Sequence, residues 1–70
     1  MTQYKITYYT HPGTVLSRQH VMVNTLCKAE SHAMYFYRRH HEHGPVHVWG
    51  RSRMGEWEII ASNEDIEELM

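Results

Sequence analysis

Four of the seven histidines in this 70-residue chain lie in the stretch YFYRRHHEHGPVHVW, residues 35–49. A zinc ion needs three or four nitrogen, sulfur or carboxylate ligands that converge within about 2.0–2.3 Å. His40 and His43 are three residues apart and therefore share one side of a helix, and His47 follows a Gly-Pro turn. These three histidines are the candidate metal ligands. Because no cysteine pair completes the set, the sequence favours no metal and no cofactor.

The same histidines have a simpler interpretation as the solvated C-terminal end of a helix. There imidazolium groups, Arg38 and Arg39 would lie at the negative end of the helix dipole, where positive charge is stabilised. The sequence favours this interpretation. Protonation of all seven histidines would change the formal net charge from −1 to +6, so we also expect partner binding to change between about pH 7 and pH 5.

Catalytic motifs give little support for an enzyme. Cys27 lies in the first turn of an expected helix, where a thiol pKa can be lowered, but a lone small residue beside an apolar stripe is more often a packing residue. The sequence contains no Gly-rich phosphate loop, nucleophile elbow or spaced carboxylate pair. We therefore predict that the protein is not an enzyme.

The location expected from the sequence is the cytoplasm. A single cysteine cannot form an intrachain disulfide, which fits a reducing compartment. The first residues lack the pattern of a secretory signal, and no apolar run approaches the roughly 20 residues of a membrane span. We expect no membrane partner.

The segment VWGRSR contains the residues best suited to recognition. Trp49, Arg51 and Arg53 alternate along an expected strand, so they are predicted to project from one face of the sheet. Arginine and aromatic side chains are enriched where proteins recognise phosphates, bases or other proteins. With Lys5, Arg18, Arg38 and Arg39 they would form a basic surface. The alternative is that Trp49 belongs to the core and the arginines are solvated edge charges.

The charge distribution suggests two surfaces and two kinds of partner. Residues 1–55 carry all seven Lys and Arg and two acids, a net +5, whereas residues 56–70 carry six acids and no base, a net −6. A DNA- or RNA-binding module is the alternative, but the pI of about 6.6 is low for one. We therefore predict binding to a protein that acts on nucleic acid, with homodimerisation left open. The acidic residues predicted to contact it are Glu64, Asp65, Glu67 and Glu68.

Local patterns predict one α+β domain over residues 1–70. Alternating residues predict strands in QYKITYYT, LSRQHVMVN and VHVWGRSRMGEWEIIAS, the last with a bulge at Gly50 and a turn at Met54-Gly55. Between them a stripe from Leu26 to His40 predicts a long helix, capped by Asn24 or Thr25 and stopped by a left-handed Gly44. SNEDIEELM predicts a short acidic helix. The expected architecture is a two-layer, mainly antiparallel sheet in ββαββ order, with the long helix packed on one face.

The element order also resembles that of a known group of proteins. The stretch VMVNTLCKAESHA, in which a strand runs into Thr25-Leu26 and then Ala29 and Ala33 of a helix, is similar to small phage-encoded ββαββ modules, among them anti-CRISPR proteins and phage inhibitors of host polymerase. The similarity covers about residues 4–61. It implies a non-catalytic inhibitor of a host nucleic-acid machine, located in the cytoplasm of the host cell, and carries over no individual binding residue.

Overall fold

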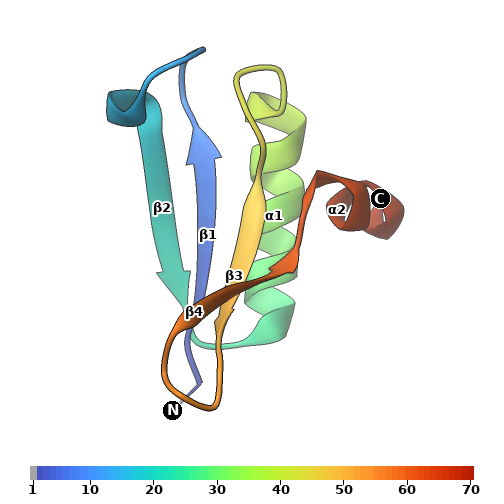
Figure 1. Cartoon of the computed structure of the whole chain (residues 1–70). Coiled ribbons are helices and arrows are strands. Elements are labelled where there is room, and N and C mark those ends of the chain that lie inside the picture. Colours follow the sequence, from blue (N-terminus) through green and yellow to red (C-terminus); the bar gives the residue numbers. More distant parts are fainter. Residues whose placement is uncertain (1) are drawn as a thin grey trace.

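Four antiparallel strands and two α-helices make up the computed structural model, which describes residues 2–70 (Figure 1). The predicted α+β class and ββαββ order, with a short helix at the end, are confirmed. A single-turn 3-10 helix, η1, precedes the second strand. The elements are β1 (Tyr4–Tyr9), η1 (Val15–Ser17), β2 (Arg18–Val23), α1 (Leu26–His40), β3 (His47–Arg51), β4 (Trp57–Ala61) and α2 (Asn63–Leu69).

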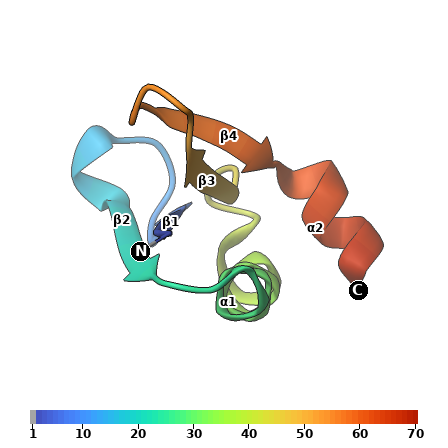
Figure 2. The same ribbon diagram turned by 90° about the horizontal axis from the view of Figure 1, so that it is seen from below.

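The strands form one sheet in the order β2-β1-β3-β4, so β1 lies in the interior of the sheet. The chain leaves the sheet at the edge strand β2, passes through α1 and re-enters on the other side of β1 as β3. Figure 2 shows α1 against one face of the sheet and α2 beyond the β4 edge. Neither α-helix of residues 2–70 covers the opposite face, which we call the open face.

Helix α1 begins where the sequence predicts it. The Thr25 side chain accepts a hydrogen bond from the backbone N–H of Lys28 and so satisfies one of the unpaired donors at the helix start. The small side chains of Ala29 and Ala33 are fully buried and let the helix lie close to the sheet. The predicted stripe is wrong at its first position, because Leu26 remains 47% exposed at the start of α1.

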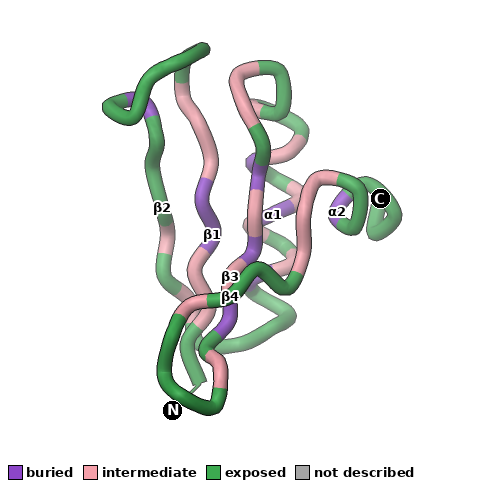
Figure 3. The backbone as a smooth tube through the Cα atoms, viewed as in Figure 1, coloured by how far each residue is buried: buried purple, intermediate pink, exposed green. Residues whose placement is uncertain are grey.

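The core lies between α1 and the two inner strands (Figure 3). Ile6 of β1 and Val48 of β3 are buried opposite each other in the sheet, and Val46 is buried just before β3. Phe36 of α1 stacks on Tyr8 with ring centroids 3.8 Å apart. Each of these side chains contributes about 1.5–3 kcal/mol on full burial, so the core fixes which face of the sheet the helix covers.

The end of α1 differs from the prediction. The helix stops at His40, and Gly44 does not adopt the left-handed conformation; among residues 2–70 only Gly13 and Gly55 have positive φ. Instead the missing side chain of Gly44 makes room for Tyr9, since a Cβ there would lie 2.6 Å from Tyr9 Cδ1. A close contact between the chain and an aromatic ring explains this glycine.

The second strand begins later than predicted. Leu16 and Ser17 belong to η1 rather than to a strand, and β2 starts at Arg18. The Ser17 hydroxyl donates to the Thr14 carbonyl oxygen (2.7 Å), and the Thr10 N–H donates to the Ser17 carbonyl oxygen (2.9 Å). These bonds close the β1–β2 connection before strand pairing starts.

The predicted bulge at Gly50 is also misplaced. Gly50 pairs regularly with Tyr4 and Glu58, and the irregularity lies one position earlier, between Val48, which pairs with Ala61, and Trp49, which pairs with Ile59. Ile60 is therefore the extra residue. Its Cγ2 would lie 3.3 Å from a Cβ at Gly50, so the glycine provides room for that side chain.

Helix α2 docks through a single buried side chain, Ile66. At its start the Asp65 carboxylate accepts hydrogen bonds from both the N–H and the hydroxyl of Ser62 (3.0 and 3.2 Å). Because seven residues are too few for an independent helix, this capping and the burial of Ile66 hold α2 in place. Neither helix in the described residues is long and apolar enough to span a lipid bilayer.

Candidate functional site

The open face gathers aromatic and cationic side chains from all four strands. Directly paired residues of antiparallel strands project to the same face, so the strand registers identify its members. Lys5 is paired with Trp49 on one side and Met22 on the other, and Arg51 with Trp57. The remaining members are Thr7, Tyr9, Arg18, His20, His47 and Ile59.

Cations alternate with indole rings across this face. The Lys5 ammonium lies 5.0 Å from the ring centre of Trp49 and 4.8 Å from that of Trp57. The Arg51 guanidinium lies 3.9 Å from the Trp57 ring, and its Nη1 donates to the Gly55 carbonyl oxygen. Such contacts are worth about 0.5–1 kcal/mol each at exposed sites. They hold both cations in defined positions without neutralising their charge.

Trp49 is fixed by a hydrogen bond within the sheet. Its indole N–H donates to the hydroxyl of Thr7 on the neighbouring strand (2.9 Å), and the ring packs edge-on against His47. Trp49 is half-buried on the open face, not in the α1 core. The alternative prediction that placed Trp49 in the core is therefore wrong.

The positive charges on the open face have no carboxylate among them. The one acid within the four strands is Glu58, and its partner Gly50 is not an open-face position. Burial lowers the pKa of Lys5, and the nearby guanidinium groups of Arg18 and Arg51 lower it further. Burial also lowers the pKa of His47, and the positive charge of Arg18 lowers it further. An anion bound here would relieve this repulsion.

Lys5, Arg18 and Arg51 surround a shallow hollow of about 550 Å³ on this face. Trp57 forms one side of the hollow, and Val15 and Met22 give it an apolar margin. The three cations and the indole therefore meet at one place on the sheet surface. This arrangement suits a ligand that carries negative charge and a flat ring together.

The predicted binding residues do not form one surface. Arg53 is not on the third strand as predicted, because β3 ends at Arg51 and Arg53 lies in the turn that leads to β4. Arg38 and Arg39 lie in the last turn of α1, in the other layer of the fold, and Arg39 stacks on Tyr35 at 4.7 Å. They therefore do not extend the basic surface of the open face.

The four predicted acidic residues lie on α2, beyond the β4 edge and beside α1 (Figure 2). Glu67 approaches Tyr37 of α1, and burial together with this carboxylate raises the pKa of the Tyr37 hydroxyl. Asp65 caps its own helix. Glu64 and Glu68 are exposed. The negative charge of α2 is therefore kept apart from the cations of the open face, whereas Glu56 and Glu58, the other two acids of residues 56–70, flank Trp57 in the sequence.

The candidate metal ligands are divided between the two layers. The rings of His40 and His43 lie 6.1 Å apart beside the end of α1, whereas His47 projects from the open face. Within residues 2–70 no three His, Cys, Asp or Glu side chains gather closely enough to hold a metal ion. The exposed Cys27 lies in the first turn of α1.

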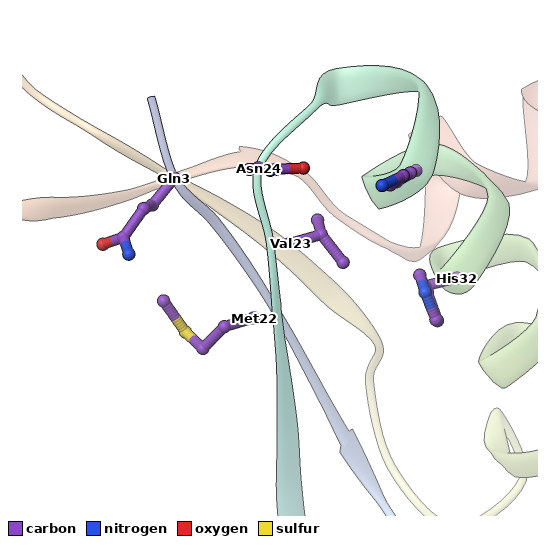
Figure 4. A pocket seen from close by; sticks show the side chains of 6 residues that line it. Gln3, Met22, Val23, Asn24 and His32 are labelled. Atoms are coloured by element: carbon purple, nitrogen blue, oxygen red, sulfur yellow. The ribbon is translucent and has the colours of Figure 1, made fainter. Parts of the chain in front are cut away.

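A second hollow lies at the end of β2 and contains no comparable cluster. Figure 4 shows Gln3 and Met22 on one side of the strand and Val23 and His32 on the other. Among residues 2–70, Lys28 is its one lining residue with a Lys or Arg side chain. These side chains do not converge on one point.

The fold and the open face define a class of protein rather than a family. The chain is a two-layer α+β domain with one helix-covered and one uncovered sheet face, the latter aromatic and cationic. Searches against profiles of known protein families, curated protein sequences and solved structures found no match.

Proposed function

We propose that the protein is a non-enzymatic binding module whose open face binds single-stranded nucleic acid. The observation that carries the proposal is the meeting of Lys5, Arg18 and Arg51 around a hollow beside Trp57, with no carboxylate at an open-face position of the four strands. Phosphates would contact the cations, and unpaired bases would stack on the exposed parts of the indole and guanidinium planes.

The separation of charge answers the main objection from composition. A pI of about 6.6 argues against nucleic-acid binding only if acids and bases share a surface. The acids of α2 lie beyond the β4 edge, on a helix that packs beside α1. At 0.1 M salt the Debye length is about 10 Å, so salt screens the repulsion between these acids and a nucleic-acid strand on the open face. The relevant quantity is therefore the local charge of the open face.

An extended single strand suits this face better than a duplex. The cations and indoles lie along a sheet surface, and stacking contributes about 1–3 kcal/mol per base only when the base is unpaired. Binding is expected to depend weakly on sequence, because every base has a flat ring. The prediction of an inhibitor that acts on a host protein stays a prediction, which neither the fold nor the comparisons address.

The test is fluorescence anisotropy of a labelled oligothymidylate of about 12 nucleotides, within the usual site size for one small domain. The double variant Lys5→Glu/Arg51→Glu is expected to bind at least about 10-fold more weakly than the parent. The matched control is Arg38→Glu/Arg39→Glu, which makes the same change in net charge on the α1 layer and is expected to stay within about 2-fold. Thermal melts establish that each variant is folded.

Two results would count against the proposal. Equal weakening by both double variants would mean that the oligonucleotide responds only to net charge. Equal affinity for a duplex of the same length would mean that unpaired bases do not stack on this face.

A further inference from the structure

A second surface, distinct from the open face, lies between the first turn of α1, the end of β4 and α2. Three large apolar side chains are exposed there together: Leu26 (47%), Ile60 (44%) and Leu69 (46%). They line a groove of about 610 Å³, which we call the acidic groove. Its remaining lining residues are Glu30, Ala61, Asp65 and Glu68.

Two features of the fold produce the exposed apolar strip. The bulge in β4 places the successive apolar residues Ile60 and Ala61 in the lining, where a regular strand would alternate its side chains. Helix α2 is anchored by Ile66, which leaves Leu69, almost one turn later, at the edge of the groove rather than in the core. The groove is therefore formed by three separate elements.

The charge around the strip is of one sign. Three of the seven described residues that line the groove are acids, and none of the seven is basic. The Asp65 carboxylate already accepts two hydrogen bonds from Ser62, so Glu30 and Glu68 are the carboxylates expected to meet an incoming cation. An apolar strip between carboxylates is complementary to a segment with apolar side chains on one side and Lys or Arg at its margins.

We propose that the acidic groove binds a basic amphipathic segment of another protein. Apolar side chains of that segment contact Leu26, Ile60 and Leu69, and its flanking cations lie against Glu30 and Glu68. The open face is not required for this contact, so the module is able to hold a basic protein segment and a nucleic-acid strand at the same time.

The probe for this proposal is a synthetic Leu/Lys amphipathic peptide of about 14 residues, long enough for a helix of about 21 Å. Anisotropy of the labelled peptide at physiological salt is expected to show saturable one-to-one binding, and a Leu/Glu peptide of the same pattern is expected not to bind. The open-face variant Lys5→Glu/Arg51→Glu is expected to bind the Leu/Lys peptide at least as well as the parent, which separates the two proposals.

Two kinds of variant test which contacts hold the peptide. Glu30→Lys/Glu68→Lys is expected to weaken binding at least about 10-fold, whereas Glu42→Lys/Glu56→Lys, with the same charge change outside the groove, is expected to stay within about 2-fold. Leu69→Ser is expected to weaken binding several-fold without any change in charge. Thermal melts establish that each variant is folded. If Leu69→Ser disturbs the packing of α2, the Glu30→Lys/Glu68→Lys variant still tests whether the groove binds the peptide.

Three outcomes would overturn the proposal. One is no binding of the Leu/Lys peptide, and another is equal weakening by both charge-reversed pairs, which would indicate general attraction to a negatively charged chain. The third comes from sedimentation of the protein alone. If the chain self-associates and Glu30→Lys/Glu68→Lys abolishes that association, the groove binds a second copy of this chain and not a separate protein.

Discussion

Neutralising Lys5 and Arg51 is expected to reduce the salt dependence of oligonucleotide binding as well as the affinity. Three cations, Lys5, Arg18 and Arg51, surround the hollow on the open face. Each phosphate contact with a single strand contributes about −0.7 to the slope of log affinity against log salt, so three contacts give a slope of about −2. Raising the salt from about 50 to about 200 mM then lowers the affinity of the parent protein about 18-fold.

The variant Lys5→Gln/Arg51→Gln leaves only Arg18 of these three cations. Its slope is expected to fall to about −0.7, so the same change in salt lowers the affinity only about 2.6-fold. Titrations of labelled oligothymidylate at four or more salt concentrations measure both slopes. An unchanged slope in the variant would refute the reasoning, because it would mean that the phosphates contact cations elsewhere on the protein.

Two further predictions concern stability. Gly44→Ala places a Cβ 2.6 Å from Tyr9 Cδ1, so the free energy of unfolding measured in urea is expected to fall by about 1–3 kcal/mol. This loss is expected to disappear largely in a Tyr9→Ala background. A loss that persists there would exclude the ring as its cause. Burial lowers the pKa of His40, and neighbouring cationic groups lower it further. The Nδ1 atom of His40 is buried without a hydrogen-bond partner. As the pH falls through about 6.5, the unfolded chain takes up a proton at His40 before the folded chain does, so the free energy of unfolding falls from pH 7 to pH 5. His40→Gln is expected to make this fall less steep. A variant that loses stability as steeply as the parent would contradict this.

Local patterns in the sequence were sufficient for much of the fold. Alternation of side chains located β1 and β4, and Thr25 marked the start of α1, because these signals depend on neighbours along the chain. The acidic start of α2 was equally clear. A turn was predicted at Met54-Gly55, and Gly55 has the positive φ that glycine adopts readily.

The composition of the open face required the strand order, which local patterns do not contain. The sequence identified Trp49 and Arg51, but β1 lies next to β3 only after the chain has passed through α1. That pairing places Lys5 between the two indoles and makes Trp57 part of the same cluster. Lys5 and Arg18 were predicted to join Trp49 and Arg51 in a basic surface, but alternation in β1 did not indicate that Lys5 would lie between two indole rings.

Other differences come from contacts between distant segments. The reason for Gly44 is the ring of Tyr9, which lies 35 positions earlier in the sequence, so a helix-stop rule gave the wrong conformation. Arg53 was placed on β3 because alternation continues past the point where the turn begins. His40 and His47 are close in sequence but lie on opposite sides of the sheet.

The most direct test of the open face uses the two tryptophans of the chain, both of which belong to it. In a ¹H–¹⁵N correlation spectrum they give two indole N–H signals, well separated from the backbone amides. On titration with oligothymidylate, we expect both indole signals and the Lys5 amide to shift and saturate together, while the amides of α2 stay in place. Shifts confined to α1 and α2, with both indole signals unmoved at saturation, would contradict the assignment of nucleic-acid binding to this face.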